Sequence, residues 1–363
     1  MESSHSKFFY MPEVTLDRLS VLVVEDNLFM RVLLGNVIRS LGVEQVFKCS
    51  SASSALNQIN KVHNDPASAG ISVIDLIVID VVMPEVDGNM LLRWIRSAAS
   101  PDRFLPTIMI SGAAGFDSVR KARDLGATEF LAKPFSGLSV ADKLMRTVFS
   151  PRQFVLAPQY FGPDRRRAPS EAVLERRILE EEDILVVYED STPKGIVEAN
   201  VIYFRFQNRL AGKVGGVPLS GIPKLNPEII AAADSKIEAV AGDYSDWALK
   251  SVRGLSKSLS ELSSGAGQSA KLLAELNNVA HELRGQGGTF GYPLVTEFAQ
   301  SLFQATTDSQ VKVTDNHMEF YKAHIDAINV VMTNKVKGDG GEVGQSLLKG
   351  LEAARKKYAA THA

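Results

Sequence analysis

Residues 75 to 80 read Asp-Leu-Ile-Val-Ile-Asp, a four-residue apolar run between two acids. Runs of a similar kind occur at Ser20 to Val24, Thr107 to Ile110 and Glu129 to Ala132, and a weaker one lies at Gln45 to Lys48. Strands with near-continuous apolar sequence are typical of parallel sheets that are covered on both faces. We therefore predict five buried strands in this part of the chain.

Amphipathic segments separate and follow these runs. Strands that alternate with helices predict a parallel sheet with helices packed on both of its faces. We expect residues 17–149 to form one doubly wound α/β domain with a five-stranded parallel sheet. The length of this segment is common for a single domain. The predicted helices cover residues 28–41, 52–63, 88–98, 116–125 and 138–148.

The composition is that of an ordinary globular protein. A length of 363 residues suggests two or three domains. The formal net charge is −2, so no general attraction to nucleic acid is expected. Cys49 is the single cysteine, which excludes an intramolecular disulfide. We see no signal peptide and no apolar stretch long enough to span a bilayer, and therefore expect a cytoplasmic protein without membrane insertion.

The sequence pattern changes twice after residue 149. Residues 150–225 are interpreted as a linker, in which the strand-like runs Ile184 to Tyr188 and Val201 to Phe206 are compatible with a short β-hairpin. Helical spacing of apolar residues then continues to the end of the chain, after a helix start at Asn226-Pro227. We predict an all-α helical bundle over residues 226–363, and an N-terminal tail over residues 1–16.

Polar residues stand where the predicted strands end. Glu25 and Asp26 follow the first strand, Asp80 ends the third, Ser111 follows the fourth and Lys133 follows the fifth. The carboxyl ends of parallel strands form the ligand crevice of an open α/β sheet, so these residues should converge. Three close carboxylates repel one another unless a cation neutralises them, and oxygen ligands suit Mg²⁺. A carboxylate beside Mg²⁺, a lysine and a hydroxyl can attack phosphorus.

These residues carry a resemblance to a known family. The segment Asp80-Val-Val-Met-Pro-Glu-Val-Asp-Gly, with Glu25-Asp26, Ser111 and Lys133-Pro134, resembles the response-regulator receiver domain. The resemblance covers about residues 17 to 149, and implies a flavodoxin-like fold in which Asp80 is phosphorylated.

The same resemblance implies roles for the neighbouring residues. Mg²⁺ would be bound by Asp26, Asp80 and the backbone carbonyl of Val82, and Glu25 would act through a water. Ser111 and Lys133 would contact the phosphoryl group. Phe130, three residues before the lysine, matches the aromatic switch position of the family.

A second group of residues surrounds His281, in the stretch Ala-His-Glu-Leu-Arg-Gly-Gln-Gly-Gly-Thr-Phe-Gly at residues 280–291. At about 100° per residue, His281 lies about 200° from Val279, so we expect it to face solvent, where a neutral imidazole can attack phosphorus. Gly285 and Gly288 would leave room for a partner's recessed active site, and Arg284 could meet the charge of the transferring group. The apolar stripe that defines the buried side is Leu272, Leu276, Val279, Leu283 and Phe290, with Gly287 in the same row.

The string that begins at His281 resembles the histidine phosphotransfer (HPt) domain. The matching residues are His281, Leu283, Arg284, Gly285 and Gly291. At the position of Arg284 lysine is commoner in that family, so the charge is retained while the geometry differs. The resemblance covers about residues 226 to 360, with detail only at 277–292.

Together, these features predict a signalling protein of a phosphorelay. Asp80 would accept a phosphoryl group in a Mg²⁺-dependent reaction, and His281 would carry phosphate to or from a receiver aspartate. The expected partners are a separate histidine kinase, a separate response-regulator receiver, or both. No ATP-binding kinase motif is visible, so we expect a phosphoryl carrier and not an enzyme.

Two other classes of function stay open. One is a scaffold that binds two-component partners without being phosphorylated, which the intact Asp80, Lys133 and His281 disfavour. The other is a phosphatase with an aspartyl nucleophile. That chemistry usually needs a second acid two residues after the nucleophile, where this chain has Val82.

Overall fold

The structure is a computed structural model that describes residues 14–69, 73–83, 85–112, 116–165, 184–190, 201–206, 208–216, 221–263, 269–307 and 313–360. Nearly all of the predicted N-terminal tail lies outside these ranges. The chain divides into two compact units. One comprises residues 1–110, 115–131 and 137–233, and the other comprises residues 234–363 with the short segments 111–114 and 132–136.

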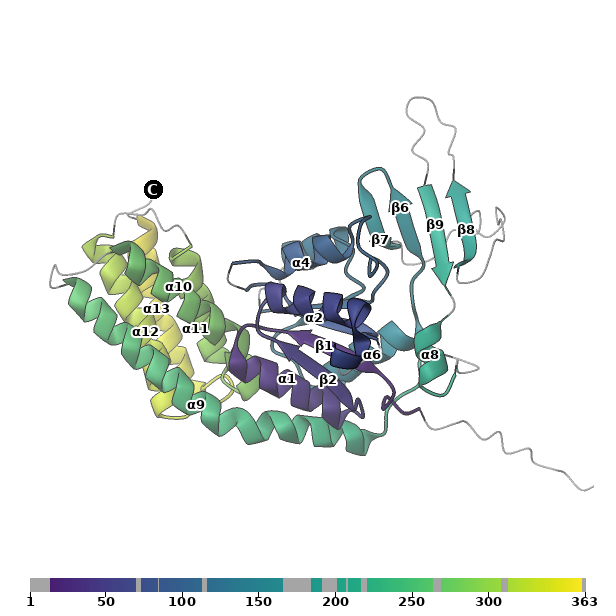
Figure 1. Cartoon of the computed structure of the whole chain (residues 1–363). Helices are drawn as coiled ribbons and strands as arrows, with labels where there is room; N and C mark the ends of the chain where they lie inside the picture. Colours follow the sequence, from purple (N-terminus) through teal and green to yellow (C-terminus); the bar gives the residue numbers. More distant parts are fainter. Residues whose placement is uncertain are drawn as a thin grey trace, which may run out of the picture. The chain divides into compact units, whose positions relative to one another are not determined.

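A five-stranded sheet forms the centre of the N-terminal domain (Figure 1). Its order is β2-β1-β3-β4-β5, which is the order of flavodoxin-like folds, so the predicted doubly wound α/β fold is confirmed. All residues of β1, β3 and β4 are buried, which explains their near-continuous apolar sequences. The strands are β1 (Ser20–Val24), β2 (Gln45–Cys49), β3 (Leu76–Asp80), β4 (Thr107–Ser111) and β5 (Glu129–Ala132).

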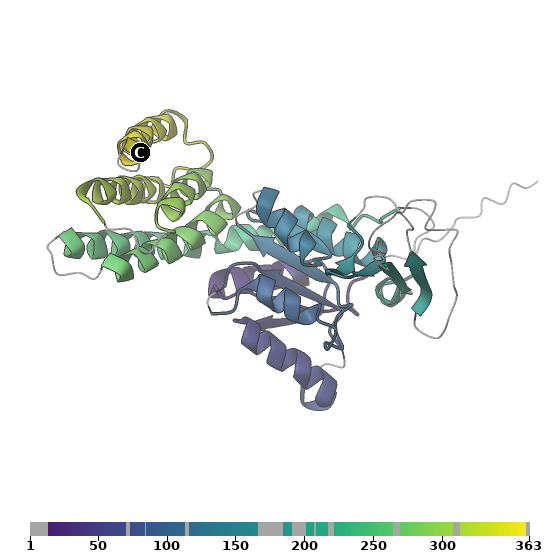
Figure 2. The same cartoon turned by 90° about the horizontal axis from the view of Figure 1, so that it is seen from above.

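Helices lie on both faces of this sheet (Figure 2). Alternate residues of β1 and β3, such as Leu22 and Ile77, share one core cluster with buried residues of α2 and α4. Helices α1 and α6 pack against each other. The helices are α1 (Leu28–Ser40), α2 (Ala52–Asn64), α3 (Pro66–Ala69), α4 (Gly88–Ile95), α5 (Phe116–Asp124) and α6 (Gly137–Phe149). All of them except the short α3, which was not predicted, lie within a few residues of the predicted ranges.

A second sheet lies in the segment that was expected to be a linker. Its antiparallel strands have the order β7-β6-β9-β8. The two strand-like runs pair as β8 and β9, whereas β6 and β7 were not predicted. Strands of four residues give little periodic signal, and Gly and Pro in β7 weaken it further. The strands are β6 (Phe154–Ala157), β7 (Tyr160–Pro163), β8 (Ile184–Asp190) and β9 (Val201–Phe206).

Aromatic rings fasten the second sheet to the rest of its unit. Phe104, in the loop before β4, lies 5.3 Å from the ring of Phe154, 5.2 Å from that of Phe161 and 5.5 Å from that of Phe204 (ring centroids). Gly126 has φ +92°, and a Cβ added there would lie 2.8 Å from the carbonyl oxygen of Phe161. This close approach, and not only the turn, requires glycine at position 126.

Arg96 is buried at the end of α4, beside the same cluster. Its guanidinium donates hydrogen bonds to the carbonyl oxygens of Gly126, Arg103 and Leu105 and to the hydroxyl of Thr107, at 2.8–3.0 Å. It also lies 5.1 Å from the centroid of the Phe154 ring. One side chain therefore connects α4, two loops and β4 with the second sheet.

Short helix α8 (Arg209–Lys213) is attached to the parallel sheet through an ion pair. Nζ of Lys213 lies 2.7 Å from Oδ1 of Asp75, a carboxylate that is only 5% exposed. The Asn208 side chain, which caps α8, donates a hydrogen bond of 2.7 Å to the carbonyl of Val148. Residues 208–213 are thus part of the folded N-terminal unit.

The C-terminal part is helical, as predicted. Helices α10 and α11, α11 and α12, and α12 and α13 pack as neighbours, and Tyr244 of α9 stacks on Phe290 with ring centroids 4.4 Å apart. The elements are α9 (Pro227–Ser263), α10 (Ser269–Gln286), a 3₁₀ turn (Gly287–Phe290), α11 (Pro293–Ala305), α12 (Asp315–Thr333) and α13 (Gly341–Ala360). In the described ranges, no helix combines the length and apolar character that crossing a membrane would require.

A buried hydrogen-bond chain joins three of these helices. His324 of α12 has no exposed surface. Its Nδ1 lies 2.8 Å from the carbonyl oxygen of Phe320, and its Nε2 lies 3.0 Å from Oγ of Ser301 on α11. Nε of Arg355 on α13 donates to the same hydroxyl at 2.9 Å.

Candidate functional site

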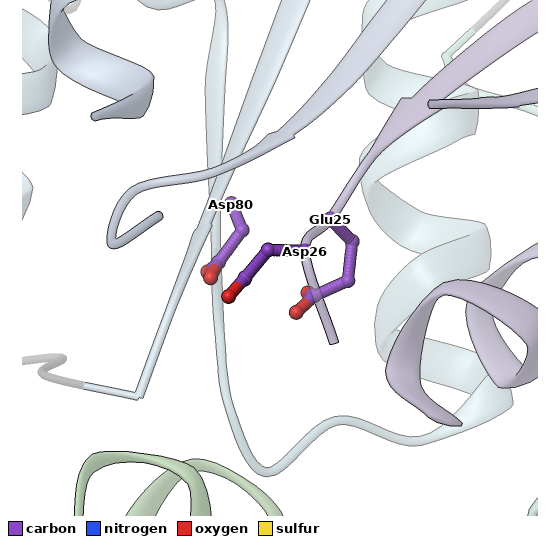
Figure 3. Close-up of side chains that lie close together, drawn as sticks. All are labelled: Glu25, Asp26 and Asp80. Carbon is purple, nitrogen blue, oxygen red and sulfur yellow. The ribbon is translucent and has the colours of Figure 1, made fainter. Parts of the chain in front are cut away.

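Three carboxylates meet at the carboxyl edge of the parallel sheet. One carboxylate oxygen of each of Glu25, Asp26 and Asp80 lies within 4.8 Å of the others, and Figure 3 shows the three side chains gathered on one side of the strand ends. Glu25 and Asp80 are buried, and Asp26 is half-buried. The structure therefore brings together the three acids that the sequence singled out.

The end of β1 is held by an arginine that the sequence analysis missed. Nη1 of Arg31 donates hydrogen bonds of 2.6 Å to the carbonyl oxygen of Glu25 and 2.8 Å to that of Asp26. The side chain of Asn27 caps the following helix, α1, by accepting from the Met30 amide. The available signal was Arg31 near the start of a helix that closely follows the two acids. A long side chain at that position can reach back toward the N-terminus of the helix.

The loop after Asp80 is tight because of Gly88. The Gly88 amide donates to the carbonyl of Val81 at 2.9 Å, and a Cβ on Gly88 would lie 2.0 Å from the carbonyl oxygen of Asp80. Any larger residue would push the loop away from Asp80. Asp87 caps α4 through its contact with the Met90 amide, and Val82, whose carbonyl was expected to bind metal, is exposed at the loop surface.

Ser111 and Lys133 occupy the ends of the next two strands. Ser111 ends β4, and Lys133 directly follows β5. The Lys133 amide donates to the Ser111 carbonyl at 2.8 Å, which extends the pairing of these strands to their ends. Both residues are buried, and the peptide bond between Lys133 and Pro134 is cis. Phe130 in β5 is half-buried and packs against the core cluster.

Known proteins share this domain. The family model described as response regulator receiver domain matches residues 21–144. Residues 21–144 are a response regulator receiver domain. Receiver domains act in two-component signalling through phosphorylation of an aspartate.

Two curated relatives show different extents of overlap. Over 128 residues the chain is 33% identical to protein-glutamate methylesterase/protein-glutamine glutaminase 1 of Syntrophomonas wolfei. The aligned segment covers 34% of this chain and 32% of that protein. Over 128 residues it is 28% identical to chemotaxis protein CheY of Bacillus subtilis. Here the aligned segment covers 35% of this chain and 96% of CheY. The chain thus spans about a third of the length of the methylesterase.

Solved structures are similar over the same share of the chain. A putative response regulator from Chloroflexus aurantiacus is 26% identical, with 35% of this chain and 95% of that chain covered and a TM-score of 0.31. Chemotaxis protein CheY4 of Vibrio cholerae is 23% identical, with 35% and 97% covered and a TM-score of 0.31.

Outside the receiver domain, His281 lies on α10 and is half-buried, not fully exposed as expected. The buried seam of α10 runs through Leu273, Leu276, Ala280 and Leu283, and Val279 is only half-buried. Because Ala280 belongs to the seam, His281 is about 100° from it and lies at the flank of the buried side.

Side chains from α10 and α11 lie against the His281 imidazole. Its ring centroid lies 5.7 Å from that of Phe303 on α11. Arg284 is only 2% exposed, so its side chain does not project into solvent. Its guanidinium carbon lies 4.1 Å from the centroid of the Phe303 ring, and the guanidinium contacts Nδ1 of His281 at 2.9 Å. Burial, and after it the charge of Arg284, lower the pKa of His281, so the imidazole is neutral at neutral pH.

Glycine occupies the positions after His281 for different structural reasons. A Cβ on Gly287 would lie 2.9 Å from Oγ1 of Thr296, so this glycine permits close packing of α11. Gly291 has φ +83° and ends the 3₁₀ turn. Gly285 is buried, and within the described bundle, residues 234–360, no side chain other than those of its two chain neighbours lies within 4 Å of a Cβ built on it. Gly288, on the 3₁₀ turn, is half-buried, and its amide donates to Thr296.

Proposed function

We propose that this protein is an intermediate of a phosphorelay with two phosphate carriers, Asp80 of the receiver domain and His281 of the helical bundle. The observation that carries the proposal is the group of three carboxylates at the carboxyl edge of the receiver sheet. Asp80 is the phosphoryl acceptor in this group because it ends the central strand β3, next to the loop that Gly88 holds close.

The donor set of this site fits Mg²⁺. Two of the three acids are buried, and buried carboxylates in one place repel each other unless a cation is bound. Glu25, Asp26, Asp80 and the carbonyl of Val82 offer oxygen ligands only, as Mg²⁺ prefers. When bound, the ion would neutralise the acids and the oxygens of the incoming phosphoryl group.

The receiver residues then have defined tasks. A carboxylate oxygen of Asp80 attacks phosphorus, and the bond from phosphorus to the donor atom breaks as the new P–O bond forms. The ammonium of Lys133 offsets charge on the phosphoryl oxygens, and the hydroxyl of Ser111 hydrogen-bonds to one of them. Phe130 follows Ser111 when that hydroxyl moves, which makes β4 and β5 the switch of the domain.

The proposal for His281 rests on the HPt-like string and on its surroundings. A lowered pKa keeps the imidazole neutral, which a nucleophile requires. Glycine at position 285 adds no side chain to that side of α10, and, apart from its two chain neighbours, no described bundle side chain lies within 4 Å of a Cβ built there. The bundle itself would therefore not obstruct the edge of a receiver domain. Phosphate would pass between His281 and a receiver aspartate. The partners are a separate histidine kinase, a separate receiver, or both.

Phosphorylation of the full-length chain tests both carriers. The protein is incubated with acetyl phosphate, with and without Mg²⁺, or with a phosphorylated receiver protein, and the modified residues are mapped by mass spectrometry. We expect Mg²⁺-dependent labelling of Asp80 by acetyl phosphate and labelling of His281 by the phosphorylated receiver. Asp80→Asn should abolish the first and His281→Gln the second.

Asp87→Asn is the matched control for the receiver site. Asp87 lies in the same loop, but its side chain caps α4, and asparagine caps a helix equally well. Undiminished labelling of Asp80→Asn, or labelling that ignores Mg²⁺, would remove the receiver assignment. An unlabelled His281 under every donor would restrict the function to the receiver domain.

A further inference from the structure

Arg284 makes an unusual contact with the proposed nucleophile. Its Nη2 lies 2.9 Å from Nδ1 of His281, three residues earlier on the same helix. A guanidinium has only donors and stays protonated in proteins, so Nδ1 must be the acceptor in this hydrogen bond. The side chain therefore does more than supply charge near the histidine.

This contact decides which nitrogen carries the proton. In a neutral imidazole one nitrogen bears hydrogen and the other offers a lone pair in the ring plane. Since Nδ1 accepts from Arg284, the proton of neutral His281 is on Nε2. Nε2 then has no lone pair for attack, and the lone pair of Nδ1 is occupied by Arg284.

Two residues of α11 keep Arg284 in this position. Nη1 of Arg284 donates to Oε1 of Gln300 at 3.2 Å, and the guanidinium lies over the ring of Phe303. Stacking on an aromatic ring and a second hydrogen bond both favour one orientation of the planar group. The contact with His281 is therefore set by the packing of α10 on α11.

We infer that Arg284 is a latch on His281, which caps Nδ1, keeps the proton on Nε2 and must leave Nδ1 before the histidine can accept phosphate. This inference rests on the proposed carrier role of His281 and adds a positioning residue to it. Gln300 and Phe303 set how firmly the latch is held.

The transfer step balances once the latch is released. The proton moves to Nδ1, and the lone pair of Nε2 attacks the phosphorus of an aspartyl phosphate. The N–P bond forms while the bond from phosphorus to the aspartate oxygen breaks, and the carboxylate leaves with the electron pair. If Nδ1 attacks instead, the proton remains on Nε2, and release of Arg284 is needed all the same.

The tautomer is measured directly by ¹⁵N NMR of the full-length protein with labelled histidine, with His281 assigned by comparison with His281→Gln. In the wild type we expect a protonated Nε2 and an unprotonated, hydrogen-bonded Nδ1. In Arg284→Met, which keeps the length of the side chain but no donor, both tautomers should be populated. A protonated Nδ1 in the wild type would overturn the inference.

The chemical consequence is measured with diethyl pyrocarbonate, which acylates an imidazole lone pair. We expect the acylation rate of His281, followed by peptide mapping of the full-length chain, to rise about tenfold in Arg284→Met, because a charge-assisted hydrogen bond no longer occupies the lone pair. Gln300→Leu should also raise the rate. Gln304→Leu, the same change one turn away at an exposed position, should leave it unchanged.

Unchanged or slower acylation in both Arg284→Met and Gln300→Leu would contradict the latch. Neither experiment uses phosphate, so its outcome is separate from that of the proposed function. A His281 that never accepts phosphate but shows the expected tautomer would refute the carrier role alone. A His281 that accepts phosphate but has its proton on Nδ1 would refute the latch alone.

Discussion

His324 is the most deeply buried histidine of the described bundle, and both of its ring nitrogens have partners. A carbonyl oxygen only accepts, so Nδ1 donates to Phe320 and Nε2 accepts from the hydroxyl of Ser301. Arg355 in turn donates to that hydroxyl. Burial, assisted by the charge of Arg355 and opposed by the Phe320 carbonyl, lowers the pKa of His324 to about 4.

This pKa predicts a pH-dependent stability. The unfolded histidine, with a pKa near 6.5, binds a proton between pH 6.5 and about 4 that the folded one does not. The contribution of neutral His324 to the free energy of unfolding is therefore fully present above pH 6.5. It is lost as the pH falls toward 4, by up to about 3 kcal/mol. Urea denaturation of the full chain at pH 7.5 and 4.5 measures this, and His324→Gln should lose less stability between the two values than the wild type. Equal losses in both proteins would show that His324 does not contribute.

Gly285 and Gly287 lie two residues apart, yet different constraints act on them. We expect Gly287→Ala to destabilise the bundle by about 1–3 kcal/mol, because the new Cβ meets Thr296. Gly285→Ala should stabilise it by up to about 1 kcal/mol, since alanine is the better helix former. Denaturation of the two variants provides the comparison.

Access to His281 can be separated from stability by a larger residue. Gly285→Leu should keep or raise stability but slow transfer from a phosphorylated receiver strongly, because attack needs the reacting atoms within about 3–3.5 Å. The measurement is a time course of phosphate transfer to the full chain. Transfer at the wild-type rate would show that Gly285 has no role in access.

At the scale of elements, the sequence predicts what is periodic or continuous. The five parallel strands and their helices were found because buried strands such as β3 consist almost entirely of apolar residues. Strands β6 and β7 are too short to show a period, and their place depends on Phe104 and Arg96, which are far away in sequence. The orientation of α10 was misjudged because Ala280, a small residue, belongs to its buried seam.

Arg96 should be essential for joining the second sheet to the first. Burial lowers its pKa to about 9, so it remains charged at neutral pH and needs all of its acceptors. Arg96→Met would leave three carbonyls and a hydroxyl without this donor, at a cost of at least about 3 kcal/mol. Arg93→Met, an exposed arginine of the same helix, is the control and should change stability little. Similar unfolding midpoints for the two variants would refute the role of Arg96.

At the scale of the whole molecule, two compact units predict two unfolding transitions. The proposed Mg²⁺ site exists only in the folded receiver domain, so Mg²⁺ should raise the midpoint of one transition and leave the other unchanged. Glu25→Gln should reduce that shift, and His324→Gln should affect the other transition. Differential scanning calorimetry of the full chain, with Mg²⁺ or with a chelator, measures these effects. A Mg²⁺ shift of both transitions, or of neither, would contradict the assignment.

The ion pair between Lys213 and Asp75 has a practical consequence for anyone who excises the receiver. The family match ends at residue 144, but a fragment cut there would lose Lys213 and leave the carboxylate of Asp75 without its cation. The ring of Phe104 would lose its contacts with Phe154, Phe161 and Phe204 and become part of an exposed apolar patch that favours association. Such a fragment should precipitate or self-associate on purification, whereas one that extends through residue 216 should remain monodisperse.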